Sequence, residues 1–161
     1  MALAVALVAA PSVALAQISG RIVENVGIKT AKLGLHDTTD AHRLGWSYKH
    51  VVDKDYQGAG YTVHEYFFGA KSSKTHKYPL EMYSRSNRHV FTFIVNSSAL
   101  VTKNGTHVGT TETALKSRYG SKVVRRTTSN GYSYYRMSGS GGHTEFWCKS
   151  GRVAYILVTV Y

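Results

Sequence analysis

The sequence predicts an α+β fold of two tandem units, each a short helix followed by about three antiparallel strands, in a sheet with helices on one face. Residues 34–45 and 109–120 are both twelve residues long and both begin and end in glycine, and Asp37, Thr38 and Arg43 align with Glu112, Thr113 and Arg118. Residues 80–88 align without a gap with residues 144–152, and each segment then runs into a stretch rich in β-branched and aromatic residues. Internal similarity of this kind indicates a duplicated unit.

The second glycine-bounded segment carries the start and stop signals of a short helix. Thr110 or Thr111 can accept a hydrogen bond from the free N–H groups of the first helical turn. Leu115 and Tyr119 are four residues apart, so they share one face of the helix. Gly120 is then expected to end the helix in the left-handed conformation that glycine adopts at low cost.

The first helix lacks one apolar residue of the second. Asp40 stands where the aligned second helix has Leu115. A carboxylate does not add to an apolar face, so we expect the first helix to be shorter or less well buried. For the same reason Asp40→Leu is expected to be neutral or stabilising, whereas Leu115→Asp should unfold the second unit.

The N-terminal residues 1–16 have the composition of a secretory signal peptide. They are almost purely apolar and uncharged, and Ala14-Leu15-Ala16 has the small-x-small pattern of a cleavage site. The alternative is a buried N-terminal helix, since the run is too short to span a bilayer comfortably. We expect cleavage after Ala16 and a single secreted domain at 17–161, with repeats at about 25–96 and 100–161. The protein is therefore expected to be extracellular or associated with the cell wall.

The charge of the chain is strongly basic. Twenty Lys and Arg against nine Asp and Glu give a formal net charge of +11. Such a protein is attracted to anionic surfaces such as cell-wall polymers, acidic lipids, nucleic acid or acidic proteins. The longest basic run is Arg125-Arg126, which argues against a dedicated nucleic-acid site.

Residues 109–120 together with residues 146–156 resemble exported actinobacterial proteins of the β-lactamase-inhibitory-protein and BamE (SmpA/OmlA)-like superfamily. The resemblance covers roughly residues 25–161 and implies two tandem helix-plus-antiparallel-sheet units that bind other proteins. One branch inhibits β-lactamases, and another is a lipoprotein of outer-membrane assembly. The chain lacks a cysteine after the predicted signal, so the lipoprotein role does not fit. Its single cysteine, Cys148, is expected to be a small buried hydrophobe, whereas the inhibitors resemble disulfide-closed halves.

Catalytic and metal-binding patterns are weak. His36 and Asp40 are four apart and could together hold a metal, but no third ligand is signalled. His143 and Glu145 share one face of a strand, where an exposed ion pair is a commoner role than acid–base catalysis. The sequence contains no nucleophile elbow, phosphate-binding loop or dinucleotide fingerprint. We therefore expect no catalytic residues, no metal and no cofactor.

The last two predicted strands alternate, which assigns their residues to faces. The residues expected to face the helices are Phe146, Cys148, Ala154, Ile156, Val158 and Val160. Those expected to point away are Trp147, Val153, Tyr155 and Leu157. Alternation in the Tyr-rich segment 132–137 makes Tyr134 a further candidate for the outer face.

This outer face is the predicted binding site. Exposed Trp and Tyr beside Arg are typical of surfaces that bind proteins. The predicted protein-binding residues are Trp147, Tyr155, Tyr134, Arg136 and Arg152. The sequence thus favours a secreted, non-enzymatic module whose partner is another exported or cell-surface protein, and inhibition of that partner is the form of binding that the resemblance implies for one branch. The alternative is a cationic cell-envelope protein that binds acidic cell-wall polymers, which steep salt dependence would identify.

Overall fold

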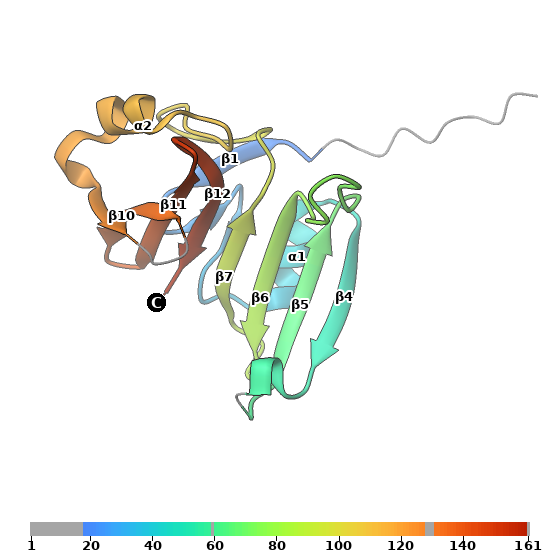
Figure 1. The fold of residues 1–161 in the computed structure, drawn as a ribbon. Helices are drawn as coiled ribbons and strands as arrows, with labels where there is room; N and C mark the ends of the chain where they lie inside the picture. The colour runs from blue at the N-terminus through green and yellow to red at the C-terminus, as the bar shows by residue number, and fades with distance from the viewer. Residues whose placement is uncertain (1–17, 59, 128–130, 161) are drawn as a thin grey trace, which may run out of the picture.

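The computed structural model describes residues 18–58, 60–127 and 131–160, so the expected signal peptide and its cleavage site lie outside the described residues. Two eight-residue helices are present in this part of the chain, α1 (Asp37–Leu44) and α2 (Glu112–Tyr119), with short 3₁₀ turns at Tyr56–Gly58 and Gly120–Lys122 (Figure 1). No helix in the described chain has the length and apolar character needed to cross a lipid bilayer.

Strands dominate the described residues, in two sheets. The smaller sheet contains β1 (Gly20–Val23), β2 (Gly27–Ile28), β3 (Ala31–Lys32) and β8 (Leu100–Thr102). The larger sheet contains β4 (Tyr48–Asp53), β5 (Val63–Phe68), β6 (Leu80–Arg85), β7 (Val90–Val95), β9 (Val124–Thr127), β10 (Ser133–Gly139), β11 (Gly142–Lys149) and β12 (Arg152–Thr159).

The predicted α+β fold of two units with about three strands each is wrong: the protein is mainly β, with twelve strands and two short helices in the described chain. The sequence does not predict edge strand β4. Its residues are mostly exposed, and they therefore lack the apolar alternation that identifies a half-buried strand. The smaller sheet was not predicted either, because β1 pairs in parallel with β8, which is far away in the sequence, and local sequence patterns do not reveal such a pairing.

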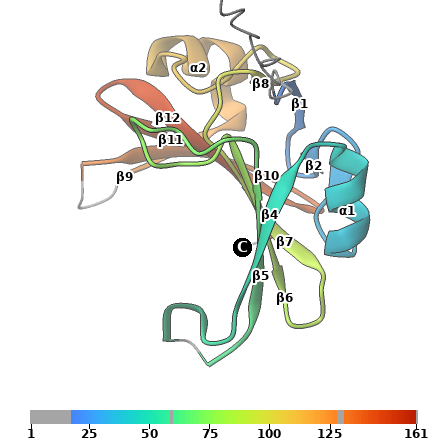
Figure 2. The ribbon, with the colours of Figure 1, turned by 90° about the vertical axis from the view of Figure 1, so that its right-hand side faces the viewer.

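The larger sheet is antiparallel throughout, in the order β4-β5-β6-β7-β12-β11-β10-β9. Figure 2 shows that this sheet is strongly curved, with both helices and the smaller sheet against its convex side. No helix or strand of the described chain covers the concave side, which we call the open face. The loop at residues 69–79 and residues 54–58 and 60–62 project from its ends on the open side.

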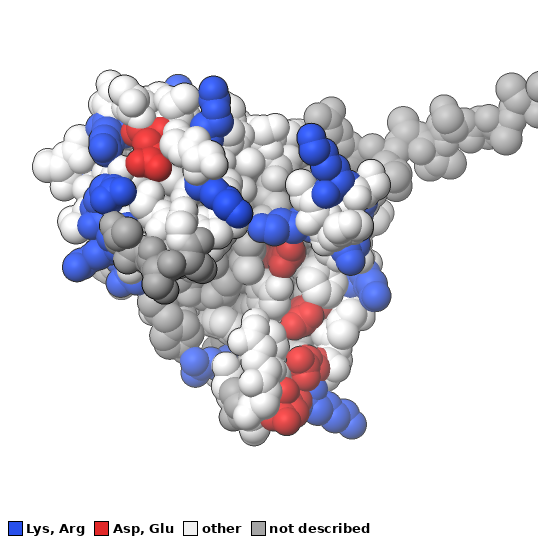
Figure 3. Space-filling view, in the orientation of Figure 1, with Lys and Arg blue, Asp and Glu red and all other residues white. Residues whose placement is uncertain are grey.

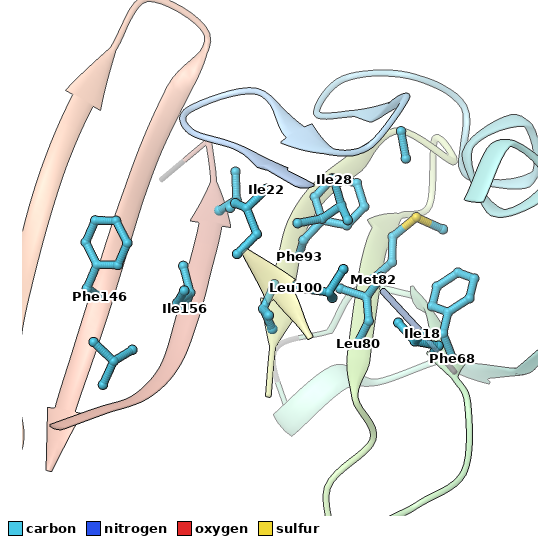
Figure 4. Close-up of a cluster of buried hydrophobic side chains, with 14 of the residues drawn as sticks. Ile18, Ile22, Ile28, Phe68, Leu80, Met82, Phe93, Leu100, Phe146 and Ile156 are labelled. Carbon is cyan, nitrogen blue, oxygen red and sulfur yellow. The ribbon is translucent and has the colours of Figure 1, made fainter. Parts of the chain in front are cut away.

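The core lies between the convex side of the larger sheet and the elements that cover it (Figure 4). Ile22 and Ile28 of the smaller sheet pack with Met82 and Phe93 of the larger one, and all four are fully buried. Fully burying an aliphatic or aromatic side chain contributes roughly 1.5–3 kcal/mol. One continuous apolar cluster therefore holds the two sheets together.

Helix α2 begins as expected and ends differently. The hydroxyl of Thr111 accepts a hydrogen bond of 3.2 Å from the backbone N–H of Ala114, which makes Thr111 the N-cap. Gly120 has φ 53° and ψ −129°, so it lies outside the left-handed helical region that we predicted for it. Residues 120–122 instead continue as one 3₁₀ turn before β9.

Helix α1 is neither shorter nor less buried, which corrects the expectation from Asp40. Both helices have eight residues, and the Asp40 side chain is fully buried. Its Oδ2 accepts a hydrogen bond of 3.0 Å from the backbone N–H of Lys32 in β3. The carboxylate therefore connects α1 to the smaller sheet, a role that Leu115 does not have in α2.

The face assignment in the C-terminal hairpin is right at the centre and wrong at its ends. Ile156 and Val158 are buried as expected, but Val160 is 40% exposed. The register between β11 and β12 shifts between Trp147 and Cys148, so Val153 rather than its neighbour Ala154 lies in the core. A bulge inserts one extra residue and thereby inverts the alternation beyond it.

Candidate functional site

Three aromatic rings form a stacked row on the open face, which we call the aromatic ladder: Tyr134, Trp147 and Tyr155. They occupy directly opposed positions on β10, β11 and β12. The ring centroids of Tyr134 and Trp147 are 4.7 Å apart at 18°, and those of Trp147 and Tyr155 are 5.4 Å apart at 12°. Stacked aromatic pairs of this kind contribute about 0.5–1.5 kcal/mol each beyond the area they bury.

Glu145 fixes the orientation of the ladder from the same face of β11. The indole Nε1–H of Trp147 donates to Glu145 Oε2 at 2.7 Å. The guanidinium of Arg136 forms a salt bridge with Glu145 Oε1 at 2.6 Å, and its centre lies 5.7 Å from the Tyr134 ring. Because Glu145 is only 3% exposed, these bonds hold the tryptophan and the arginine in one arrangement.

His143 lies next to this ion pair on β11. Its Nε2 is 3.4 Å from Glu145 Oε1. Burial, followed by the charge of Arg136, lowers the pKa of His143 below its ordinary value. The neutral imidazole is therefore favoured, and the Arg136–Glu145 pair is the charged element at this position.

A groove of about 480 Å³ opens beside the ladder. Its lining combines two ladder rings with side chains from β6, β7, β12, the loop at 69–79 and the residue before β10: Lys77, Glu81, Ile94, Tyr132, Trp147, Tyr155 and Leu157. The ammonium of Lys77 lies 5.0 Å from the Tyr155 ring and thus overhangs one side. The groove offers apolar and aromatic walls with one carboxylate and one ammonium at its margin.

The structure brings together four of the five predicted site residues. Tyr134, Trp147, Tyr155 and Arg136 lie on one part of the open face. Arg152 is separate: its guanidinium donates to the backbone oxygen of Gly109 at 3.0 Å and holds the loop before α2.

Sequence reasoning missed three contributors to this site. Glu145 was treated as half of an exposed ion pair, although its position two residues before Trp147 on the same face could have identified it as the indole acceptor. Ile94 comes from the other half of the sheet because β7 pairs with β12. Lys77 comes from a long loop whose path the sequence does not reveal.

The two candidate metal-binding residues, His36 and Asp40, have separate hydrogen-bond partners. His36 Nδ1 is 2.9 Å from the Thr38 hydroxyl, and Asp40 bonds the backbone of Lys32. Within the described ranges, no three His, Cys, Asp or Glu are grouped so that they could hold a metal ion. Cys148 is free and buried, and burial raises the pKa of its thiol to about 12.

A second buried polar cluster ties α1 to the larger sheet. Asp37, at the start of α1, accepts a short hydrogen bond from the hydroxyl of Ser84 and one of 2.9 Å from Arg88 Nε. Arg88 also donates to the hydroxyl of Tyr66 at 2.9 Å. Burial raises the pKa of Asp37, but the bonds from Ser84 and Arg88 outweigh this effect and lower it. The cluster is therefore explained by a structural ion pair between Asp37 and Arg88.

Comparison with known proteins supports the fold alone. No protein-family model matches the chain, and no curated protein matches it. Among solved structures, the chain is similar to the crystal structure of the uncharacterized protein yfeY from Escherichia coli. That likeness has a TM-score of 0.53 and 12% sequence identity, and it covers 89% of this chain and 99% of the other. At this identity the shared property is the arrangement of strands and helices.

Proposed function

We propose that the protein is an exported, non-enzymatic module that binds another exported or cell-surface protein through the aromatic ladder and the groove beside it. The observation that carries the proposal is the orientation of the ladder. Trp147 is stacked between two tyrosines and hydrogen-bonded to Glu145 on a sheet face that no described helix or strand covers. Aromatic side chains held in one rotamer lose little entropy on binding, so they suit a protein interface.

Arginine beside the ladder adds a second feature of such interfaces. Arg136 lies against Tyr134 while its charge is compensated by Glu145. Tryptophan, tyrosine and arginine are the residues that most often dominate binding energy in interfaces. Inhibition of a partner enzyme, which the resemblance implies for one branch, is the first activity to assay.

Paired substitution in the ladder tests this proposal. The double variant Trp147→Ser and Tyr155→Ser should keep the fold and lose partner capture from cell-envelope and culture-fluid fractions, measured by quantitative mass spectrometry. Tyr48→Ser is the matched control, since Tyr48 is a 37% exposed tyrosine on edge strand β4. Equal capture by the wild type and the ladder variant would contradict the proposal.

The net charge of +11 supports a second candidate, a cationic envelope protein that binds acidic cell-wall polymers. The two candidates respond differently to salt. Binding to a polyanion through exposed charges weakens steeply between low and physiological ionic strength, whereas binding through a largely apolar groove weakens little. The polymer role predicts that the ladder variant still binds purified wall polymer as the wild type does.

Export is part of the proposal and rests on residues 1–16. Cleavage after Ala16 should give a mature protein that begins at Gln17. N-terminal sequencing of protein from the medium tests this, and recovery of a chain that still begins at Met1 would contradict it.

A further inference from the structure

Three acidic residues form a diagonal strip across the open face on β4, β5 and β6: Asp53, Glu65 and Glu81. Val51 opposes Glu65 and Phe67 opposes Glu81, so each acid is a diagonal neighbour of the next. Diagonal neighbours in an antiparallel pair are roughly 7–8 Å apart. Figure 3 shows acidic side chains in a line on this part of the surface, with Lys and Arg mainly around it.

Two cations border the strip, because Lys49 and Arg85 are also diagonal neighbours of Glu65. Within the described residues, no Lys or Arg forms a salt bridge with Asp53, Glu65 or Glu81. The donors to Glu81 are neutral, namely the hydroxyl of Tyr83 at 2.7 Å and the amide of Asn96 at 3.0 Å. Burial, then the charges of Asp53 and Glu81, raises the pKa of Glu65. The three acids therefore repel one another without a salt bridge, among the described residues, that would offset the repulsion.

The acidic strip leads directly into the apolar groove. Glu81 belongs to both, because it lines the groove together with Ile94, Leu157, Trp147 and Tyr155. Glu81 opposes Ile94 on β7, and Ile94 in turn opposes Leu157 on β12. Negative charge and an aromatic pocket are therefore adjacent on one concave surface.

We propose that the open face binds a protein segment that presents Lys or Arg to the acidic strip and an aromatic or aliphatic side chain to the groove. This inference rests on the proposed function and specifies the chemistry of its partner. Charge complementarity selects the occupant, because an acidic segment would meet repulsion at the strip. Since the rest of the molecule is basic, a basic segment is also repelled elsewhere and is thereby guided to this face.

Peptide binding tests the inference directly. The probes are a fluorescein-labelled peptide, Gly-Phe-Leu-Lys-Arg-Lys-Gly, and its counterpart with Glu in place of the three basic residues, measured by fluorescence anisotropy at physiological salt. The wild type should bind the basic peptide at least about tenfold more tightly, despite its own net charge of +11. Asp53→Asn with Glu65→Gln should weaken binding about two- to fivefold per charge removed, the range typical of exposed ion pairs.

A matched control removes one negative charge elsewhere. Glu24→Gln lies in the turn between β1 and β2, and its amide oxygen can still accept the hydrogen bond from the Tyr119 hydroxyl. This variant should bind the basic peptide as the wild type does. The strip variant should also keep or raise its melting temperature, because repulsion is relieved. A structural role for the strip would instead lower the melting temperature.

Three outcomes would overturn the inference. One is equal or tighter binding of the acidic peptide, and another is equal weakening by Glu24→Gln. The third is concentration-dependent dimerisation in sedimentation velocity that Asp53→Asn with Glu65→Gln abolishes, since the occupant would then be a second copy of this chain. The proposed function has a separate test: it fails if the ladder variant captures partners as the wild type does.

Discussion

The hydroxyl of Tyr135 donates a hydrogen bond of 2.7 Å to Glu112, the first residue of helix α2. Tyr135 lies on β10 and is almost fully buried. Glu112 also accepts a bond of 3.2 Å from the Ser133 hydroxyl on the same strand. One carboxylate therefore favours the N-terminus of the helix and at the same time holds that end against the larger sheet.

Removal of this hydroxyl should loosen the second helix. Tyr135→Phe is expected to lower the free energy of unfolding by about 1.5–3 kcal/mol, the range for a hydrogen bond to a charged group. Urea denaturation followed by circular dichroism measures the change. Tyr134→Phe is the control, since the Tyr134 hydroxyl has no hydrogen bond within the described chain, and it should have little effect. Equal losses in both variants would show that the Glu112 bond is not the cause.

Leu115→Asp should unfold the second helix and destabilise the whole domain. Leu115 is fully buried, so the substitution places an unpaired carboxylate in the apolar core. A change of this type costs about 4 kcal/mol or more. Differential scanning calorimetry should show a strongly lowered melting temperature or no cooperative transition. An unchanged melting temperature would contradict the observed packing of α2.

Asp40→Leu should destabilise the protein, in contrast to the expectation from the sequence. The substitution leaves the backbone N–H of Lys32 without its acceptor, the fully buried Asp40 carboxylate, at a part-buried position. An orphaned buried donor costs about 1–3 kcal/mol. Chemical denaturation compares this variant with Asp40→Asn, whose amide oxygen can still accept the bond and which should lose less. Greater stability of Asp40→Leu than of the wild type would refute the role of this bond.

The ionisation of Asp40 should give stability a distinct pH dependence. Burial raises the pKa of Asp40 from 3.8 to about 6 in the folded protein. The folded state therefore binds the proton more tightly, and the associated stability is complete below pH 4 and lost as the pH rises through 6. The free energy of unfolding of the wild type, relative to Asp40→Asn, should fall between pH 4 and pH 7. A constant difference over this range would show that the pKa is not raised.

Cys148 should be unreactive in the native protein. Burial raises the pKa of its thiol to about 12, so almost no thiolate is present at neutral pH. Labelling by a thiol-reactive disulfide reagent should be slow in buffer and fast in denaturing guanidinium. Rapid labelling of the folded protein would contradict the buried position of the side chain.

Local signals predicted α2 better than α1. Thr111 caps α2 as expected, because a cap depends on residues within one helical turn. The expectation for Asp40 is wrong, because Asp40 accepts a hydrogen bond from the backbone of Lys32 in another element. The free-energy cost of burying a charged side chain can be judged from the residue type alone. The hydrogen-bond partner that offsets this cost comes from another part of the fold, so the sequence does not reveal it.

The sequence by itself determined the alternation within β11 that puts Phe146 in the core and Trp147 on the other face, because this depends only on the period of a strand. It also determined that α2 starts at a threonine cap, Thr110 or Thr111, and that the chain has an excess of positive charge. Only the tertiary structure decided that β7 pairs with β12, that β1 pairs with β8, and that a bulge moves Val153 into the core. These features depend on segments far apart in the chain, whose pairing is selected by the total apolar area that the whole molecule buries. The groove and the acidic strip exist for the same reason, since each is assembled from several strands.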